Sequence, residues 1–294
     1  MDKVDITKYR VADVRKLTDR PTYEDFGKSE KKLEIELVKT RVVLGEFQDV
    51  LYAHGKYSVL ICLQGMDSAG KDSLIREVFK DFNISGVEVT SFKVPTDLEL
   101  KHNYLWRHYI ALPAKGKFGV FNRTHYENVL VTRVHPQYIM AENIPGIHEV
   151  SDIDQKFWDK RFEQIINFEQ HLAEHGTLIF KFFLHLSKEE QRKRLLRRLE
   201  KRVKNWKFSP DDLEERELWD SYQKYYEEAM NRTSTEQAPW FVIPADNKTA
   251  SRLIVASILL QELTQFKDIK EPELSDKVKA NLEYYKELLE KGKV

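Results

Sequence analysis

A lysine in a glycine-bounded loop follows directly after a short apolar run near residue 60. The run Val59–Leu63 leads through Gln64 into the segment GMDSAGKDS, and a helix-like pattern begins after Lys71. Glycines let the backbone turn so that successive N–H groups point inward, and the helix start adds positive potential behind them. Strand, loop and helix in this order predict a phosphate-binding loop, with the lysine charge meeting the outer phosphates. The residues expected to contact phosphate are Gly65, Ser68, Ala69, Gly70, Lys71, Asp72 and Ser73.

Two positions of this loop depart from the usual pattern. A Ser or Thr normally follows the lysine, but here Asp72 follows it and Ser73 comes one residue later. The carboxylate of Asp67 would repel phosphate unless a cation lay between them, so we interpret Asp67 as a metal ligand. Oxygen ligands suit Mg²⁺, which binds through carboxylate and substrate phosphate. The alternative is a chance loop with a solvated lysine.

A second polar group follows the predicted strand Phe118–Phe121. P-loop kinases carry an acidic residue near this point that helps to hold Mg²⁺. Here the strand-end residue is Asn122, a neutral and weaker oxygen donor, and Glu127 lies further along. Arg123 and Arg133 are spaced to reach phosphate oxygens, and the arginine fork can bind two oxygens at once. The alternative for Arg123 is a structural ion pair.

Apolar runs alternate with helical periods along most of the chain. This alternation predicts an α/β fold, a three-layer sandwich in which a five-stranded parallel sheet has helices on both faces. Ligands bind such sheets at the carboxyl ends of the strands, where the loop, Asn122 and Asp246 all fall. The predicted strands are Val59–Leu63, Val87–Phe92, Phe118–Phe121, Thr177–Leu186 and Trp240–Ile243. Helices are predicted at 29–53, from 72, at 97–111, at 152–175, after 187, after 210, at 248–266 and at 273–291.

Composition and charge set the broad class. The 294 residues are 41% hydrophobic, which is enough for a large core, and Lys+Arg equals Asp+Glu at 48 each. A balanced charge carries no information about partners. The single cysteine excludes an internal disulfide, and the charged N-terminus does not resemble a secretory signal. The longest apolar run, Ile254–Leu260, is too short to span a membrane. We therefore expect a soluble, cytoplasmic protein with no membrane partner.

The segment Lys188–Lys207 is the most basic part of the chain, with ten Lys or Arg and three Glu. Three interpretations are open: a solvated helix face, a nucleic-acid site, or a site for a long anionic substrate. No RNA-recognition motif accompanies the segment and its aromatic residues are sparse, which argues against a nucleic-acid partner. Its position after the fourth strand, where P-loop kinases carry a lid, favours the long anion.

Five ordered blocks resemble the polyphosphate kinase 2 family. They are GMDSAGKD, SFKVPTDLELKHNYLWRHYIALP, FNRTHYENVLVTRVHP, NWKFSPDDLEERELWDSYQKYYEEAM and TSTEQAPWFVIPAD, and the likeness runs from about Ser29 to Leu263. The resemblance implies a P-loop kinase fold with a helical lid at approximately 188–230. It also implies phosphoryl transfer between inorganic polyphosphate and nucleotides that depends on Mg²⁺, with Mn²⁺ as an alternative, and a homo-oligomer, dimer or tetramer. The implied organisation is an arm at 1–28, a kinase domain at 29–270 and a C-terminal helix at 271–294.

The resemblance also assigns roles to single residues. Asp67 and Lys71 match the family's loop aspartate and lysine, and Asn122 stands where many members have an aspartate. The block FNRTHYEN is similar to the class III members that phosphorylate both nucleoside mono- and diphosphates, whereas members with one acceptor resemble FDRSWYNR there. The implied catalytic residues are Asp67, Lys71, Arg123 and Glu127; the implied nucleotide-binding residues are Asn122, Arg123 and Glu127; the implied metal ligands are Asp67 and Asn122. The resemblance also implies that Arg133, Arg194 and Arg198 contact polyphosphate.

The expected reaction is therefore the reversible transfer of the terminal phosphoryl of polyphosphate to ADP and AMP, which regenerates ATP. A first alternative is an ATP-dependent kinase of a nucleotide or small metabolite on the same loop. A second is a non-enzymatic protein whose basic helix binds nucleic acid. One departure, Lys248-Thr249-Ala250 after the IPAD block, stands where an aromatic residue is more usual.

Overall fold

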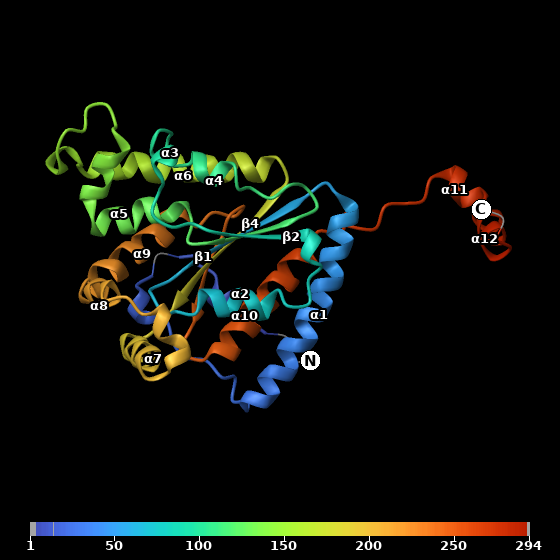
Figure 1. Ribbon diagram of the computed structural model, residues 1–294, viewed down its shortest axis with the longest axis horizontal. Coiled ribbons are helices and arrows are strands. Elements are labelled where there is room, and N and C mark those ends of the chain that lie inside the picture. The colour runs from blue at the N-terminus through green and yellow to red at the C-terminus, as the bar shows by residue number, and fades with distance from the viewer. Residues whose placement is uncertain (1–3, 14, 293–294) are drawn as a thin grey trace.

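The computed structural model describes residues 4–13 and 15–292, which fold around one five-stranded sheet (Figure 1). All neighbouring strands are parallel, in the order β2-β3-β1-β4-β5, so the strand that leads into the glycine loop is central. This confirms the predicted α/β class and the five-stranded parallel sheet. The strands are β1 Ser58–Gln64, β2 Val87–Ser91, β3 Phe118–Asn122, β4 Thr177–His185 and β5 Trp240–Pro244.

Helices cover both faces of the sheet, which is why β1 is buried along its whole length. Val59, Ile61 and Leu63 face the cluster that includes α1 and α10, whereas Leu60 and Cys62 face the cluster that includes α6. The longer helices are α1 Glu30–His54, α2 Lys71–Val78, α6 Gln155–Glu174, α7 Lys188–Glu200, α9 Trp219–Thr233, α10 Lys248–Leu263 and α12 Leu282–Glu290. The shorter helices are α3 Asp97–Leu100, α4 Trp106–Tyr109, α5 Val131–Val134, α8 Asp211–Glu217 and α11 Asp276–Ala280.

Three predicted helices are each divided in the structure. The stretch 97–111 forms α3 and α4 with a turn between them, and the side chain of Asn103 accepts a hydrogen bond from the Leu105 N–H in that turn. Local bonds of this kind compete with helix continuation, so the prediction of one helix was wrong. The helix predicted after 210 is likewise divided at Leu218 into α8 and α9, and the stretch 273–291 at Asn281 into α11 and α12.

The N-terminal arm packs on the body of its own chain. The Val11 N–H donates to the Trp240 carbonyl at 2.9 Å, and Arg10 forms an antiparallel bridge with Phe241 on β5, the last strand of the sheet. Leu17 is buried beside Trp240 in a cluster under α9. The described part of the arm is therefore packed within its own chain.

The C-terminal helices α11 and α12 extend away from the body after α10 (Figure 1). Within the described residues, none of the helices combines the length and the apolar character needed to cross a bilayer.

Leu17→Ala is expected to lower the free energy of unfolding by about 2–4 kcal/mol, because Leu17 is 4% exposed and its removal leaves a cavity. Urea denaturation measures this change. Ile84→Ala is the matched control, since Ile84 is 86% exposed and should change stability by less than about 0.5 kcal/mol. Equal stability of Leu17→Ala and the wild type would show that the arm does not pack as described.

Candidate active site

The loop between β1 and α2 has the backbone geometry of an anion cradle. Gly65 and Gly70 both have positive φ values, +150° and +106°, and Ser68 lies in the left-handed region at +65°. A Cβ at Gly65 would lie 3.0 Å from the Leu184 carbonyl oxygen, so the turn has no room for a side chain. The chain then enters α2 at Lys71, whose helix start directs N–H groups toward the loop.

Lys71 lies against this loop. Its Nζ donates to the Gly65 carbonyl at 2.6 Å and lies 3.4 Å from the Met66 carbonyl. Burial lowers the pKa of Lys71 to about 8; the Arg123 charge also lowers it, and Asp67 opposes the shift. The ammonium is therefore charged at neutral pH and is held by the same loop that would hold phosphate.

The end of β3 lies beside the end of β1, because Leu63 is paired with Asn122 in the sheet. Arg123 follows with φ +61°, and its Nη2 lies 3.0 Å from Asp67 Oδ1. Its Nη1 lies 3.4 Å from Glu127 Oε2, and this carboxylate raises the pKa of the guanidinium. The structure thus brings Asp67, Lys71, Arg123 and Glu127 to one place, as expected. Arg123 does form ion pairs, but 42% of its side chain remains exposed.

Asn122 and the acidic residues of the loop fit a divalent cation. The Asn122 amide donates to Asp72 Oδ1 at 2.9 Å, and its own Oδ1 is buried without a hydrogen-bond partner in the described structure. This unpartnered oxygen lies beside Asp72, in a cavity that Asp67 also lines. Together they offer only oxygen donors, which suit Mg²⁺ or a similar hard ion. No group of three His, Cys, Asp or Glu among the described residues could hold a metal alone. Substrate phosphate and water would therefore complete such a site.

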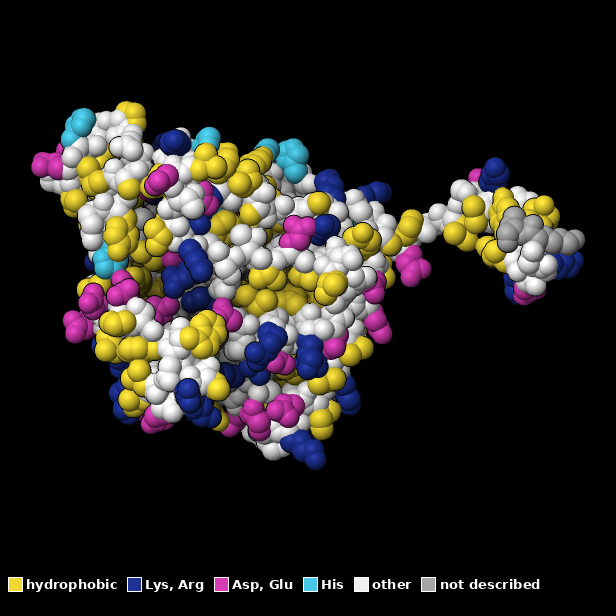
Figure 2. All heavy atoms as spheres, viewed as in Figure 1, with side chains coloured by type: hydrophobic (Ala, Val, Ile, Leu, Met, Phe, Trp, Pro, Cys, Tyr) yellow, Lys and Arg dark blue, Asp and Glu magenta, His cyan; other side chains and the backbone are white. Residues whose placement is uncertain are grey.

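A cavity of about 830 Å³ opens over the loop and extends along α2, α7 and α10. Figure 2 shows Lys and Arg side chains gathered near α2 in the middle of this face. Such a concentration of cations in a protein with no net charge is suited to a polyanion longer than one phosphate. The cations that line the cavity are Lys71, Arg76, Lys93, Arg123, Arg194, Arg197, Arg198, Lys248 and Arg252.

Arg194 reaches this cavity, but its donors are engaged inside the protein. The side chain is 4% exposed, Nη1 donates to the Ala69 carbonyl at 2.9 Å, and Nη2 donates to the Ala245 carbonyl at 2.7 Å. Its Nε donates to Glu190 at 2.8 Å. Arg194 therefore braces the glycine loop from behind, which differs from the polyphosphate contact expected from the resemblance.

Arg133 is not brought to the loop. It lies under α9, where Nη1 is 2.6 Å from Glu228 Oε2 and the guanidinium is 4.4 Å from the centre of the Tyr225 ring. The short helix α5 carries it to this place, away from the cavity lining. Arg198 does line the cavity, and it pairs with Asp212 at 2.9 Å.

Several cationic residues of the cavity were missed by sequence reasoning. Lys248 and Arg252 lie one turn apart on α10, directly after the end of β5, and Arg76 lies on α2. The available signal was their position just beyond strand ends that converge on one edge of the sheet.

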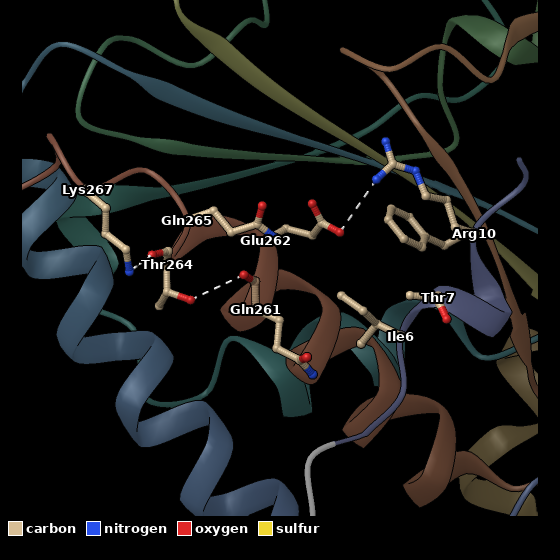
Figure 3. Close-up of a pocket in the computed structure, with 9 residues that line it drawn as sticks. Ile6, Thr7, Arg10, Gln261, Glu262, Thr264, Gln265 and Lys267 are labelled. Carbon is tan, nitrogen blue, oxygen red and sulfur yellow. Dashed lines mark hydrogen bonds and ion pairs between the residues drawn. The ribbon is translucent and has the colours of Figure 1, made fainter.

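A second cavity, of about 720 Å³, lies between the arm and the end of α10 (Figure 3). Arg10 faces Glu262 across it at 3.8 Å. The other polar residues that line it are two threonines, two glutamines and Lys267. This cavity shares no lining residue with the cavity over the glycine loop, and the charge of Arg10 is paired, so it is not a second phosphate site of the same kind.

Arg194→Met is expected to lower the free energy of unfolding by about 2–4 kcal/mol, since it leaves buried loop carbonyls without donors. Thermal or urea denaturation measures the loss. Arg192→Met on the same helix is the control, because the Arg192–Glu189 pair is exposed to solvent and exposed ion pairs contribute little to stability. Similar losses for the two variants would contradict the bracing role.

Comparison with known proteins agrees with this geometry. The family model for polyphosphate kinase 2 matches residues 27–271. An ADP-polyphosphate phosphotransferase of Rhodopseudomonas palustris is 44% identical to this chain, over 90% of this chain and 92% of the relative. An AMP/ADP-polyphosphate phosphotransferase of Meiothermus ruber is 49% identical, over 75% of this chain and 77% of the relative. The crystal structure of polyphosphate kinase 2 from Arthrobacter aurescens has a TM-score of 0.86 at 35% identity, over 95% of each chain. The chain therefore belongs to the polyphosphate kinase 2 family.

Proposed function

We propose that this protein transfers the terminal phosphoryl group of inorganic polyphosphate to ADP and to AMP, reversibly. The observation that carries the proposal is the continuity between the glycine loop at Lys71 and a cavity whose further cations extend well beyond one phosphate. The names of the Rhodopseudomonas palustris and Meiothermus ruber relatives support the same donor, and the second supports both acceptors.

On the donor side, the terminal phosphoryl group lies in the loop, where backbone N–H groups and the Lys71 ammonium neutralise its charge. Transfer to the acceptor oxygen proceeds in line through a loose transition state, so positioning and electrostatics supply most of the catalysis. No covalent enzyme intermediate is needed. A bound divalent cation, Mg²⁺ in this proposal with Mn²⁺ as the alternative, would neutralise phosphate charge; Asp67 and Asn122 would hold it, with Asp72 adjacent.

The rest of the polymer follows the basic wall of the cavity. Arg198 on α7 is the contact carried over from the resemblance, and Arg197, Arg76, Lys248 and Arg252 join it because they line the same space. We propose that α8 and the segment that joins it to α7 form the part of the lid that closes over the polymer. Arg194 on α7 is bonded to the glycine loop and the inner face of α9 is buried in the core, so both ends of the 188–230 segment stay in place.

On the acceptor side, Arg123 contacts the acceptor phosphate and Glu127 helps to orient the nucleotide or its metal. Asn122 lies between the two sides at the strand end, where many family members carry an aspartate. Four further expectations stay predictions. They are the division into an arm, a kinase domain and a C-terminal helix, the homo-oligomer, the cytoplasmic location and the absence of a nucleic-acid partner.

The direct test incubates the protein with Mg²⁺, ADP and polyphosphate in the absence of any other donor, and measures ATP. We expect ATP from the wild type and a loss of at least about 10²-fold for Lys71→Ala with its fold intact, because a preorganised charge in the loop is removed. Lys115→Ala, an exposed lysine on a distant loop, is the control. Absence of ATP from the wild type, together with transfer from ATP to an acceptor, would favour the ATP-dependent alternative.

The value of kcat/KM for polyphosphate is expected to fall above about pH 8. Burial lowers the pKa of Lys71 to about 8, so the free enzyme loses the loop charge as the pH rises through this value. Bound phosphate favours the charged ammonium, so kcat alone should decline at a higher pH. Initial rates between pH 6 and pH 10 at fixed ionic strength measure both. A kcat/KM that stays constant to pH 10 would contradict the role of this lysine.

Glu127→Asn is expected to reduce turnover with AMP more than turnover with ADP, by about tenfold in the ratio of the two kcat/KM values. The shorter acceptor needs more positioning, and Glu127 is the carboxylate nearest to Arg123 on the acceptor side. Steady-state rates with each acceptor at saturating polyphosphate measure this ratio. Equal losses with AMP and ADP would remove the special role of this carboxylate.

A further inference from the structure

A fully buried lysine lies in the middle of β4, directly beneath the segment that follows Arg123. Lys181 is 0% exposed, and its Nζ donates to Glu169 Oε2 at 2.6 Å, to the Tyr126 hydroxyl at 2.8 Å and to the Thr233 carbonyl at 2.8 Å. The three donors of the ammonium are thus all satisfied by protein groups. None of these residues lines the cavity over the loop.

Glu169 on α6 connects this lysine to the acceptor side of the site. Its Oε1 lies 3.0 Å from His125 Nε2 and accepts from the Tyr126 hydroxyl at 2.9 Å. Burial raises the pKa of Glu169, but Lys181 and the His125 hydrogen bond outweigh burial, so the net pKa lies below its ordinary value. The carboxylate is therefore ionised, and the buried pair is charged.

A buried ion pair of this kind is a poor source of stability. Removing two charges from water costs several kcal/mol per ion, and well-packed apolar residues of similar volume often stabilise a core equally well. The other residues of β4 from Leu178 to Leu184 are all apolar and the strand lies between two others, so an apolar side chain would fit the pattern. A role other than stability accounts better for a lysine at this position.

The pair holds a strained turn. Arg123 has φ +61°, a conformation that non-glycine residues rarely adopt and that persists only when the surroundings enforce it. On one side, the Thr124 hydroxyl accepts from Gln64 Nε2 at 3.1 Å and from the Tyr126 N–H at 3.1 Å. On the other side, His125 and Tyr126 are fixed by Glu169. The turn is therefore anchored both to the end of β1 and to the buried pair.

We propose that Lys181 and Glu169 are positioning residues for phosphoryl transfer, which hold the His125–Tyr126 segment so that Arg123 stands between Asp67 and Glu127. This inference rests on the proposed function. It goes beyond that function by assigning a catalytic consequence to groups that touch neither substrate. Their loss should affect the transfer step and the acceptor, while donor binding at the loop and the basic wall is largely retained.

The first experiment compares two double variants. Lys181→Met/Glu169→Leu removes the pair without leaving an unpaired charge, and Lys28→Met/Glu36→Leu removes a similarly shielded pair at the start of α1, away from the site. We expect kcat with ADP to fall at least tenfold in the first variant, with KM for polyphosphate within about twofold of the wild type. The control should keep the wild-type kcat. Wild-type kcat in both variants would overturn the proposal.

Tyr126→Phe provides a milder version of the same change, for the case in which the double variant does not fold. It removes the hydroxyl that joins both Lys181 and Glu169 to the turn, leaves the contact between His125 and Glu169, and keeps the ring against Trp240. We expect kcat to fall about threefold or more at an unchanged KM for polyphosphate. An unchanged kcat in this variant would also overturn the proposal.

A double-mutant cycle separates positioning from general damage. If the pair acts through Arg123, then Lys181→Met/Glu169→Leu should cause little further loss of kcat in an Arg123→Ala background. Multiplicative losses would show a merely structural role. Wild-type ATP formation from polyphosphate in the same assay reports on the proposed function separately. If the wild type forms no ATP, hydrogen exchange of peptides that cover residues 121–130 tests the holding role instead. Faster exchange in Lys181→Met/Glu169→Leu than in the wild type would support this role, and equal exchange rates would overturn it.

Discussion

The repulsion between phosphate groups is the constraint on which this structure depends. A donor polyanion and an acceptor nucleotide can approach one another only where positive potential is concentrated and fixed before they arrive. The protein has no net charge, so it achieves this locally: the glycine loop directs backbone N–H groups inward, Lys71 lies against the loop, and further cations line the same cavity. The acidic residues Asp67 and Asp72 in this field are consistent with a place for a divalent cation.

The order of the strands places a different structural element on each side of the glycine loop. Because β1 is central and lies between β3 and β4, its loop is flanked by the Asn122–Arg123 corner on one side and by α7 on the other. The lysine loop is held from behind by Arg194, which binds its carbonyls, and the Arg123 turn is held from below by Lys181 and Glu169. Arg194, and in our proposal Lys181 and Glu169, are thus buried charges that fix groups facing the substrates.

The sequence was sufficient for the elements with strong local patterns. All five strands, their parallel arrangement and the clustering of Lys71, Asp67, Arg123 and Glu127 follow from apolar runs that end in chemically distinctive loops. The division of 97–111 into two helices was missed because a single asparagine side chain decides it.

Roles that depend on which partner a side chain meets were harder to predict. Arg133 and Arg194 carry the right charge for polyphosphate, but tertiary packing engages them with Glu228 and with loop carbonyls. Lys181 was missed because it lies within the apolar run TLIFKFFLHL, which indicates only a buried strand. The sequence shows at which positions the arginines and lysines stand, but only the fold shows which hydrogen-bond acceptors surround each side chain.

In the proposed mechanism the loop from Gly65 to Ser73 binds the reacting end of the polyphosphate chain. A crystal structure of the protein soaked with polyphosphate would show where the polymer binds. We expect a terminal phosphate within hydrogen-bond distance of the loop N–H groups and Lys71 Nζ, with the chain continuing along α7 and α10. Polyphosphate bound elsewhere on the protein, with the loop left empty, would contradict this mechanism.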